Sequence, residues 1–242
     1  MSAEISPAQS HMLEALNWAP PSAPGLAIAA YVDDATLREG DLVSCLSQAE
    51  IAKAETLMNL AERRHFIVRR CFQRLFVALV TQWHASPGAL RMEQKLDTRP
   101  VCLDFPFLHL SFSTSGRTAV ACSHENNDVG IDVERDRVVE NVVQLARRFF
   151  TEQEADAIAA LPPEQQSYHF LLHWTAKEAG LKAIGKGIVS GLNSFCIERK
   201  TADSRYCVGG PPPDPSLWRL DYLDILPNHI IALVKKNSVD KS

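Results

Sequence analysis

Apolar residues recur with two different periods along this chain, and the changes of period predict where strands and helices lie. Short runs rich in β-branched residues are typical of strands, whereas apolar residues three and four positions apart are typical of one helix face. Strands are predicted at 26–32, 108–113, 118–122, 129–134, 194–199, 217–223 and 230–234. Helices are predicted from Ser44 or Ser47 through Leu57, and at 61–84, 140–150, 151–160 and 167–184.

The order of these elements predicts an α+β protein made of two lobes. The segment 125–128 is polar and turn-prone, and it separates two stretches of similar length. We therefore expect an N-terminal lobe over 1–124 and a C-terminal lobe over 125–242, each with a small sheet packed with helices. The Pro- and Gly-rich segment 209–215 is expected to be an exposed loop. No internal sequence repeat is visible, so a symmetry between the lobes does not follow from the pattern.

Composition and charge limit the class of protein. The chain has 242 residues, 46% of them hydrophobic, which is enough for a substantial core, and its net charge of −4 gives no general attraction to nucleic acid. No apolar run reaches the length of a membrane span, and the N-terminus lacks an export signal. The six cysteines form no C-x-x-C pair, which favours reduced thiols and a cytoplasmic protein. Two lobes in one chain make a monomer the default expectation.

One stretch opposes the overall acidity. Between Lys53 and Arg74 there are six basic residues and two acidic ones. Two interpretations stay open: a solvated helix face, or a docking surface for an anion. Nucleic acid is the less favoured anion for such a docking surface, because no recognition motif accompanies the basic residues.

Two groups of residues, one on a predicted strand and one on a predicted helix, are the main candidates for a catalytic or metal-binding site. Asp132 and Glu134 are two residues apart on a predicted strand, so both point to the same side, next to apolar residues that would anchor the strand. Trp174, Glu178 and Lys182 are four residues apart and share one helix face. Together these residues offer three carboxylates and one cation, which is how proteins handle a metal-bound pyrophosphate.

Simpler interpretations exist for the same residues. The strand carboxylates could be a solvated face neutralised by Arg135 and Arg137, and Glu178 with Lys182 could be an ordinary helical salt bridge. Other motifs lead less far. The segment 180–187 fails as a phosphate-binding loop because a helix precedes it and Gly187 replaces Ser or Thr. His169 and His173 have zinc-compatible spacing, but partly buried histidines explain them better.

The sequence resembles the Sfp-type 4′-phosphopantetheinyl transferases. Their two signatures are a Gly-Ile-Asp-[Val/Ile]-Glu strand and a Trp-[Ser/Thr]-x-Lys-Glu-Ala-x-x-Lys helix, which match 130–134 and 174–182 here. Weaker likeness extends over most of 45–200, including 98–100, 111–116 and 185–188. The resemblance implies two lobes related by a pseudo-twofold axis, with coenzyme A in the cleft between them.

The resemblance also implies roles for individual residues. Asp132, Glu134 and Glu178 would hold Mg²⁺, and Lys182 would touch the phosphates and act in catalysis together with Glu178. The other contacts to coenzyme A would come from Lys53, His65, Arg99, Ser113 and Thr114.

The chain departs from the family at two positions. Thr114 replaces a histidine that contacts the nucleotide in many members, and a hydroxyl donates a hydrogen bond but carries no charge. Glu50 stands where some relatives have a basic residue, which is expected to weaken coenzyme binding.

The function implied is transfer of the phosphopantetheine arm of coenzyme A to a serine of an apo acyl or peptidyl carrier protein, with release of 3′,5′-ADP. Glu178, directly or through water, would take the serine proton, and Lys182 would stabilise the transition state. Arg147, Arg148 and the pair 149–150 are candidate carrier contacts, or else a helix-end charge pair and core aromatics. The alternative is a non-catalytic coenzyme- or carrier-binding relative.

Overall fold

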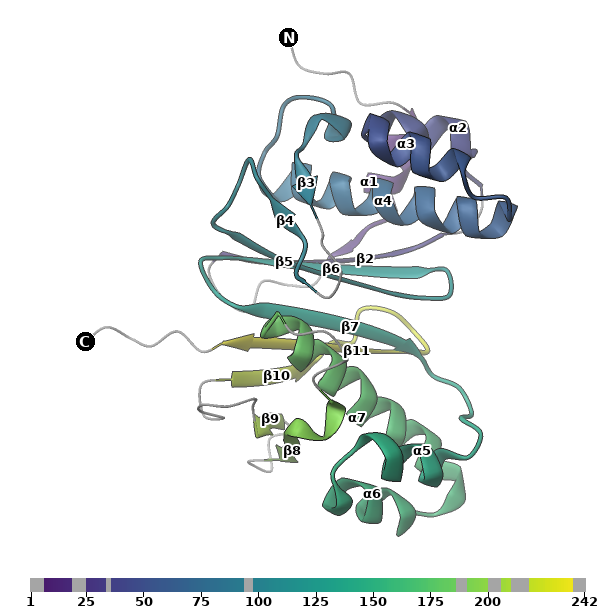
Figure 1. The fold of residues 1–242 in the computed structure, drawn as a ribbon, viewed down its shortest axis with the longest axis vertical. Helices are drawn as coiled ribbons and strands as arrows, with labels where there is room; N and C mark the ends of the chain where they lie inside the picture. The colour runs from purple at the N-terminus through teal and green to yellow at the C-terminus, as the bar shows by residue number, and fades with distance from the viewer. Residues whose placement is uncertain are drawn as a thin grey trace, which may run out of the picture.

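The computed structural model describes residues 7–18, 25–33, 36–93, 98–185, 191–199, 206–209 and 218–236. Two sheets lie face to face between two sets of helices, so the molecule has four layers (Figure 1). The first sheet has the strand order β1-β2-β6-β5 and the second β7-β11-β10-β9-β8. The predicted α+β class is confirmed. The two sheets differ in strand number and order, and a pseudo-twofold relation stays a prediction.

The first sheet and its helices come from the chain before residue 126. The strands are β1 (Asn17–Trp18), β2 (Leu26–Val32), β5 (Leu108–Ser115) and β6 (Thr118–Glu125), and a small pair, β3 (Met92–Glu93) and β4 (Val101–Cys102), lies apart from them. The helices are α1 (Pro7–Glu14), α2 (Glu39–Leu42), α3 (Gln48–Glu55) and α4 (Leu60–Val80). Short 3₁₀ turns occur at Val43–Cys45 and Pro87–Ala89.

The second sheet and its helices follow. The strands are β7 (Val129–Arg135), β8 (Cys196–Arg199), β9 (Tyr206–Gly209), β10 (Trp218–Tyr222) and β11 (His229–Lys236), all paired antiparallel. The helices are α5 (Val142–Phe149), α6 (Glu152–Ala159) and α7 (Pro163–Ala183), with a 3₁₀ turn at Leu192–Ser194. None of the helices that the structure describes is both long and apolar enough to cross a bilayer.

Alternation along β2 shows how one strand serves two cores. Ala29 and Tyr31 pack against α4 in the N-terminal core, whereas Ile28 and Ala30 face the second sheet. Val129, Ile131 and Val133 of β7 enter the same inter-sheet core. The two sheets are therefore joined by a buried apolar layer, which holds β7 at a fixed distance from the first sheet.

Local signals explain most helix boundaries. Ser47, rather than Ser44, caps α3 in a capping box with Glu50. The long helix predicted to His84 ends at Val80, because Gln82 adopts a φ of 53° and the backbone N–H of Trp83 turns back to the carbonyl of Ala78. Gly209, predicted to begin a loop, lies in β9, and the rest of that predicted loop is outside the described residues.

Candidate active site where β7 meets α7

The two groups of candidate residues predicted from the sequence, on β7 and on α7, meet where the helix crosses the strand. At Gly130 of β7, an added Cβ would lie 2.1 Å from the carbonyl oxygen of Ala179 and 2.5 Å from the backbone nitrogen of Ala183. Only a glycine permits this approach of helix and strand. It brings one face of α7 directly against the strand that carries Asp132 and Glu134.

Asp132 is the centre of the polar contacts. Its Oδ1 accepts hydrogen bonds from Lys182 Nζ of α7 at 2.6 Å and from Ser113 Oγ of β5 at 2.6 Å. The carboxylate is 5% exposed, so both bonds form in a site largely withdrawn from water. Lys182 and Ser113, which are both predicted to contact coenzyme A, therefore bind Asp132, which is a predicted metal ligand.

Glu178 has no hydrogen-bond partner for its buried Oε1 in the described part of the chain. Burial, with the charges of Asp132 and Glu134 adding to it, raises the pKa of Glu178 to about 7, although Lys182 opposes the shift. A buried carboxylate oxygen without a partner is costly and is characteristic of a group that meets a ligand or a proton.

Glu134 completes the cluster. Burial, and next the charge of Asp132, raises the pKa of Glu134, while the hydrogen bond from Ser115 Oγ to Glu134 Oε2 at 3.2 Å opposes the shift. The charge of Asp132 raises the pKa of both Glu134 and Glu178, so the cluster has excess negative charge, and such a site attracts a cation.

Alternate serines of β5 fasten the first sheet to β7, a feature that the sequence reading missed. Ser111 Oγ accepts from the backbone N–H of Ile131 at 3.1 Å, Ser113 donates to Asp132, and Ser115 donates to Glu134 and accepts from Arg135 N–H at 3.3 Å. The two-residue spacing of these serines is the feature of the sequence that could have predicted a shared direction for their side chains. We refer to Ser111, Ser113 and Ser115 as the serine row.

The chemistry of the donors fits Mg²⁺, while their arrangement does not form a ready ligand set. Carboxylates are the oxygen ligands that Mg²⁺ prefers, and Glu178 Oε1 has an unused lone pair. However, no group of three acidic, histidine or cysteine side chains within the described ranges has metal-binding geometry. In this arrangement the ammonium of Lys182 partly neutralises Asp132.

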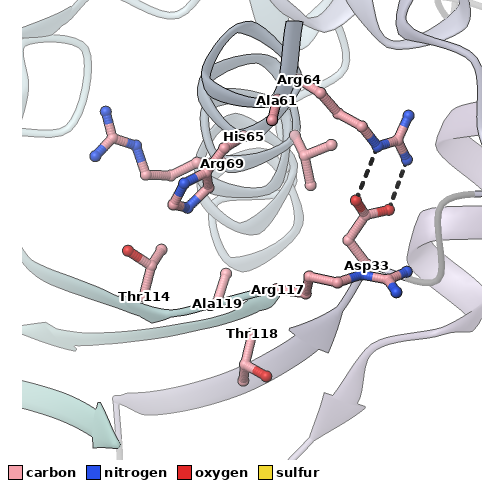
Figure 2. A pocket seen from close by; sticks show the side chains of 11 residues that line it. Asp33, Ala61, Arg64, His65, Arg69, Thr114, Arg117, Thr118 and Ala119 are labelled. Atoms are coloured by element: carbon pink, nitrogen blue, oxygen red, sulfur yellow. Dashed lines mark hydrogen bonds and ion pairs between the residues drawn. The ribbon is translucent and has the colours of Figure 1, made fainter. Parts of the chain in front are cut away.

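The remaining predicted contacts lie in three other places. His65 of α4 and Thr114 of β5 line a cavity of about 370 Å³ between that helix and the β5–β6 hairpin (Figure 2). Arg99 pairs with Asp128 at 2.5 Å and donates to His109 Nδ1 at 3.0 Å. Lys53 is exposed on α3.

Three further residues have structural contacts that the sequence did not reveal. Glu50 is 8% exposed and accepts hydrogen bonds from Arg70 and Arg74, so it holds α3 against α4. His173 is partly buried and donates from Nδ1 to the carbonyl of His169 at 2.8 Å. Trp174 packs edge-on against Phe149, with ring centroids 5.5 Å apart.

Comparison with known proteins shows which family this chain is similar to. Residues 128–234 match the family model of the 4′-phosphopantetheinyl transferase superfamily. The 4′-phosphopantetheinyl transferase HetI of Nostoc sp. is 32% identical over 61% of this chain and 63% of its own length. The transferase psf-1 of Bacillus pumilus is 33% identical over 56% of this chain and 59% of its own length. Sfp of Bacillus subtilis is 28% identical over 48% of this chain and 50% of its own length.

The class of protein is therefore a group-transfer enzyme of the 4′-phosphopantetheinyl transferase type. The resemblance to the Sfp-type enzymes is confirmed, and residues 128–234 match the model of their superfamily. The matched stretches span half to just under two thirds of these three relatives.

Proposed function

We propose that the protein transfers the phosphopantetheine arm of coenzyme A to a serine hydroxyl of an apo acyl or peptidyl carrier protein and releases 3′,5′-ADP. The observation that carries the proposal is the cluster of Asp132, Glu134, Glu178 and Lys182 at the crossing of β7 and α7. The superfamily match covers these four residues.

Asp132, Glu134 and Glu178 would hold Mg²⁺, with Lys182 moving from Asp132 to the phosphates of the donor. Bound there, the ion would neutralise charge on the pyrophosphate of coenzyme A. Of the three carboxylates, Glu178 is the one with a buried oxygen that has no hydrogen-bond partner among the described residues.

The chain's own residues account for the proton and the charge. Glu178 accepts the proton of the carrier serine at Oε1 as the serine oxygen attacks the β-phosphorus. The bond from that phosphorus to the oxygen of the leaving 3′,5′-ADP breaks, and Lys182 stabilises the negative charge that develops. His65, Thr114, Arg99, Ser113 and Lys53 are proposed to position coenzyme A.

The lobe division at residue 124, a donor cleft between the lobes, a cytoplasmic location and a monomeric state belong to the same proposal. The two sheets, built from 17–125 and 129–236, support the division. Arg147 and Arg148, near the end of α5, are proposed to receive the acidic carrier protein.

The test is a transfer assay with Mg²⁺, coenzyme A and an apo carrier protein, read by mass spectrometry as addition of the arm. We expect addition by the native chain, its loss with chelator, and a fall in turnover of about 10²- to 10⁴-fold for Glu178→Gln. Glu152→Gln, the same change at an exposed position of α6, is the matched control.

Unchanged turnover in Glu178→Gln would remove that residue as the base. If no carrier acquires the arm while coenzyme A still binds, the non-catalytic alternative replaces the proposed function.

A further inference from the structure

On the outer side of β7, the serine row takes the place of a neighbouring strand. β7 is the edge strand of the second sheet, and β11 pairs with its inner side. On the outer side, the backbone N–H of Ile131 donates to Ser111 Oγ at 3.1 Å. The backbone N–H of Arg135 donates to Ser115 Oγ at 3.3 Å. Hydroxyls of β5 therefore satisfy backbone groups that a further strand would otherwise pair with.

The two carboxylates of β7 differ in how many side chains hold them. Asp132 accepts hydrogen bonds from Lys182 Nζ and from Ser113 Oγ, at 2.6 Å each. Glu134 accepts one from Ser115 Oγ at 3.2 Å, and within the described ranges no other side chain donates to it. The orientation of Glu134 therefore depends on a single hydroxyl.

The surroundings of Ser115 give its proton one destination. A hydroxyl has one proton to donate and two lone pairs to accept with. The backbone N–H of Arg135 donates to a lone pair of Ser115 Oγ, so the proton remains for Glu134 Oε2. Ser115 is itself fixed, because it pairs in register with Thr118 at the end of the β5–β6 hairpin. The hairpin and the backbone of β7 together set the direction of this bond.

A carboxylate held in this way presents its other oxygen in a constant direction. Glu134 is only partly buried, and fixing the side chain of a glutamate costs conformational entropy. The bond from Ser115 to Oε2 fixes the side chain before a ligand arrives and leaves Oε1 to meet that ligand. Hydrogen-bond partners of metal ligands raise metal affinity through this kind of orientation.

We propose that Ser115 is a positioning residue that orients Glu134 toward the divalent ion and thereby strengthens metal binding. This inference rests on the metal site of the proposed function. Without the hydroxyl, Glu134 is free to rotate, and the ion has to fix it on binding. The loss is therefore expected in metal affinity and not in the chemical step at saturating metal.

The test compares Ser115→Val with Ser115→Thr, since these two side chains have nearly the same shape and differ in the hydroxyl. Mn²⁺, which binds the same oxygen ligands as Mg²⁺, is titrated into chelator-treated protein, and free Mn²⁺ is measured by electron paramagnetic resonance. We expect Ser115→Val to weaken Mn²⁺ binding roughly 3- to 10-fold, as for the loss of one hydrogen bond, and Ser115→Thr to stay within about twofold of the native chain. Ser115→Ala, which adds no bulk, should weaken binding by the same factor as Ser115→Val.

The transfer assay supplies a second measurement. For Ser115→Val, the Mg²⁺ concentration that gives half-maximal transfer should rise by the factor found for Mn²⁺. At saturating Mg²⁺, kcat should change less than about twofold, because the hydroxyl acts on binding of the ion.

Ser111→Ala is the matched control, because Ser111 belongs to the same row and accepts from a backbone N–H. It should lower the Tm and leave Mn²⁺ affinity unchanged. If Ser111→Ala weakens Mn²⁺ binding as much as Ser115→Val, the effect belongs to the packing of the sheets and the inference is overturned. The same holds if the native chain binds no Mn²⁺.

Metal binding measured without coenzyme A separates this inference from the proposed function. If the Mn²⁺ results hold and no carrier acquires the arm, the inference stands and the proposed function falls. If transfer occurs and both Ser115→Val and Ser115→Ala bind Mn²⁺ as tightly as the native chain, the proposed function stands and the inference falls.

Discussion

Lys177 offers the sharpest test of how α7 is held in place. Its side chain is 0% exposed, and Nζ lies 2.9 Å from Glu154 Oε2 and 2.8 Å from the carbonyl oxygen of Leu192, with a further bond to the carbonyl of Phe195. The ammonium also lies 4.9 Å from the ring centroid of Phe195. Lys177 therefore supplies the positive charge for one buried carboxylate and the hydrogen bonds for two backbone carbonyls.

Replacing Lys177 with Met keeps most of the volume and removes the charge. Glu154 would then be buried without its cation, although it would still accept from Thr151 and from the backbone N–H of Ile197. Breaking a buried pair on one side costs about 3–5 kcal/mol. For a chain of this size that corresponds to a fall in Tm of roughly 6–20 °C.

The measurement is thermal and urea unfolding followed by circular dichroism. The double variant Lys177→Met with Glu154→Gln removes both charges and keeps the capping geometry, so it should recover at least ~1 kcal/mol relative to Lys177→Met alone. If the free energy of unfolding of Lys177→Met falls by less than about 1 kcal/mol, the argument is refuted, because the buried charge of Glu154 would then not depend on Lys177 for its stabilisation.

Two other predictions concern packing and pH. Gly130→Ala should destabilise the fold by about 3 kcal/mol or more in urea unfolding, because its Cβ would collide with the backbone of α7, whereas Gly40→Ala, with open space around it, should not destabilise it in this way. Burial alone would raise the pKa of Glu50, but hydrogen bonds and charges from Arg74 and Arg70 outweigh it and lower the pKa below 4.5. The stability from this ionised carboxylate is therefore complete above pH 4.5 and lost as pH falls through the folded-state pKa, so Glu50→Gln should flatten the acid limb of a stability–pH profile; an acid limb of native slope would contradict this assignment.

Hydrophobic periodicity predicted the elements whose two faces differ. β2 was predicted at its observed bounds, because its apolar residues are limited by a Pro- and Gly-rich segment before it and polar residues after it. β9 was missed, since four residues between polar segments give no period. The extension of α4 to His84 was wrong because an apolar pattern does not show where the backbone turns back at Gln82.

The candidate site was predictable where the spacing is local. Two-residue spacing on β7 and four-residue spacing on α7 placed Asp132, Glu134, Glu178 and Lys182 on two faces, and the structure brings those faces together. The partner of a given arginine depends on long-range packing, so the sequence did not show that Glu50 neutralises two arginines.

The serine row makes the orientation of the acids depend on residues outside the superfamily match. Hydroxyls from the edge of one sheet hold two carboxylates that belong to the other. A truncated gene product that began after residue 125 would retain both sequence signatures and still lack the strand that orients them. Signature searches alone would therefore score such fragments as complete enzymes.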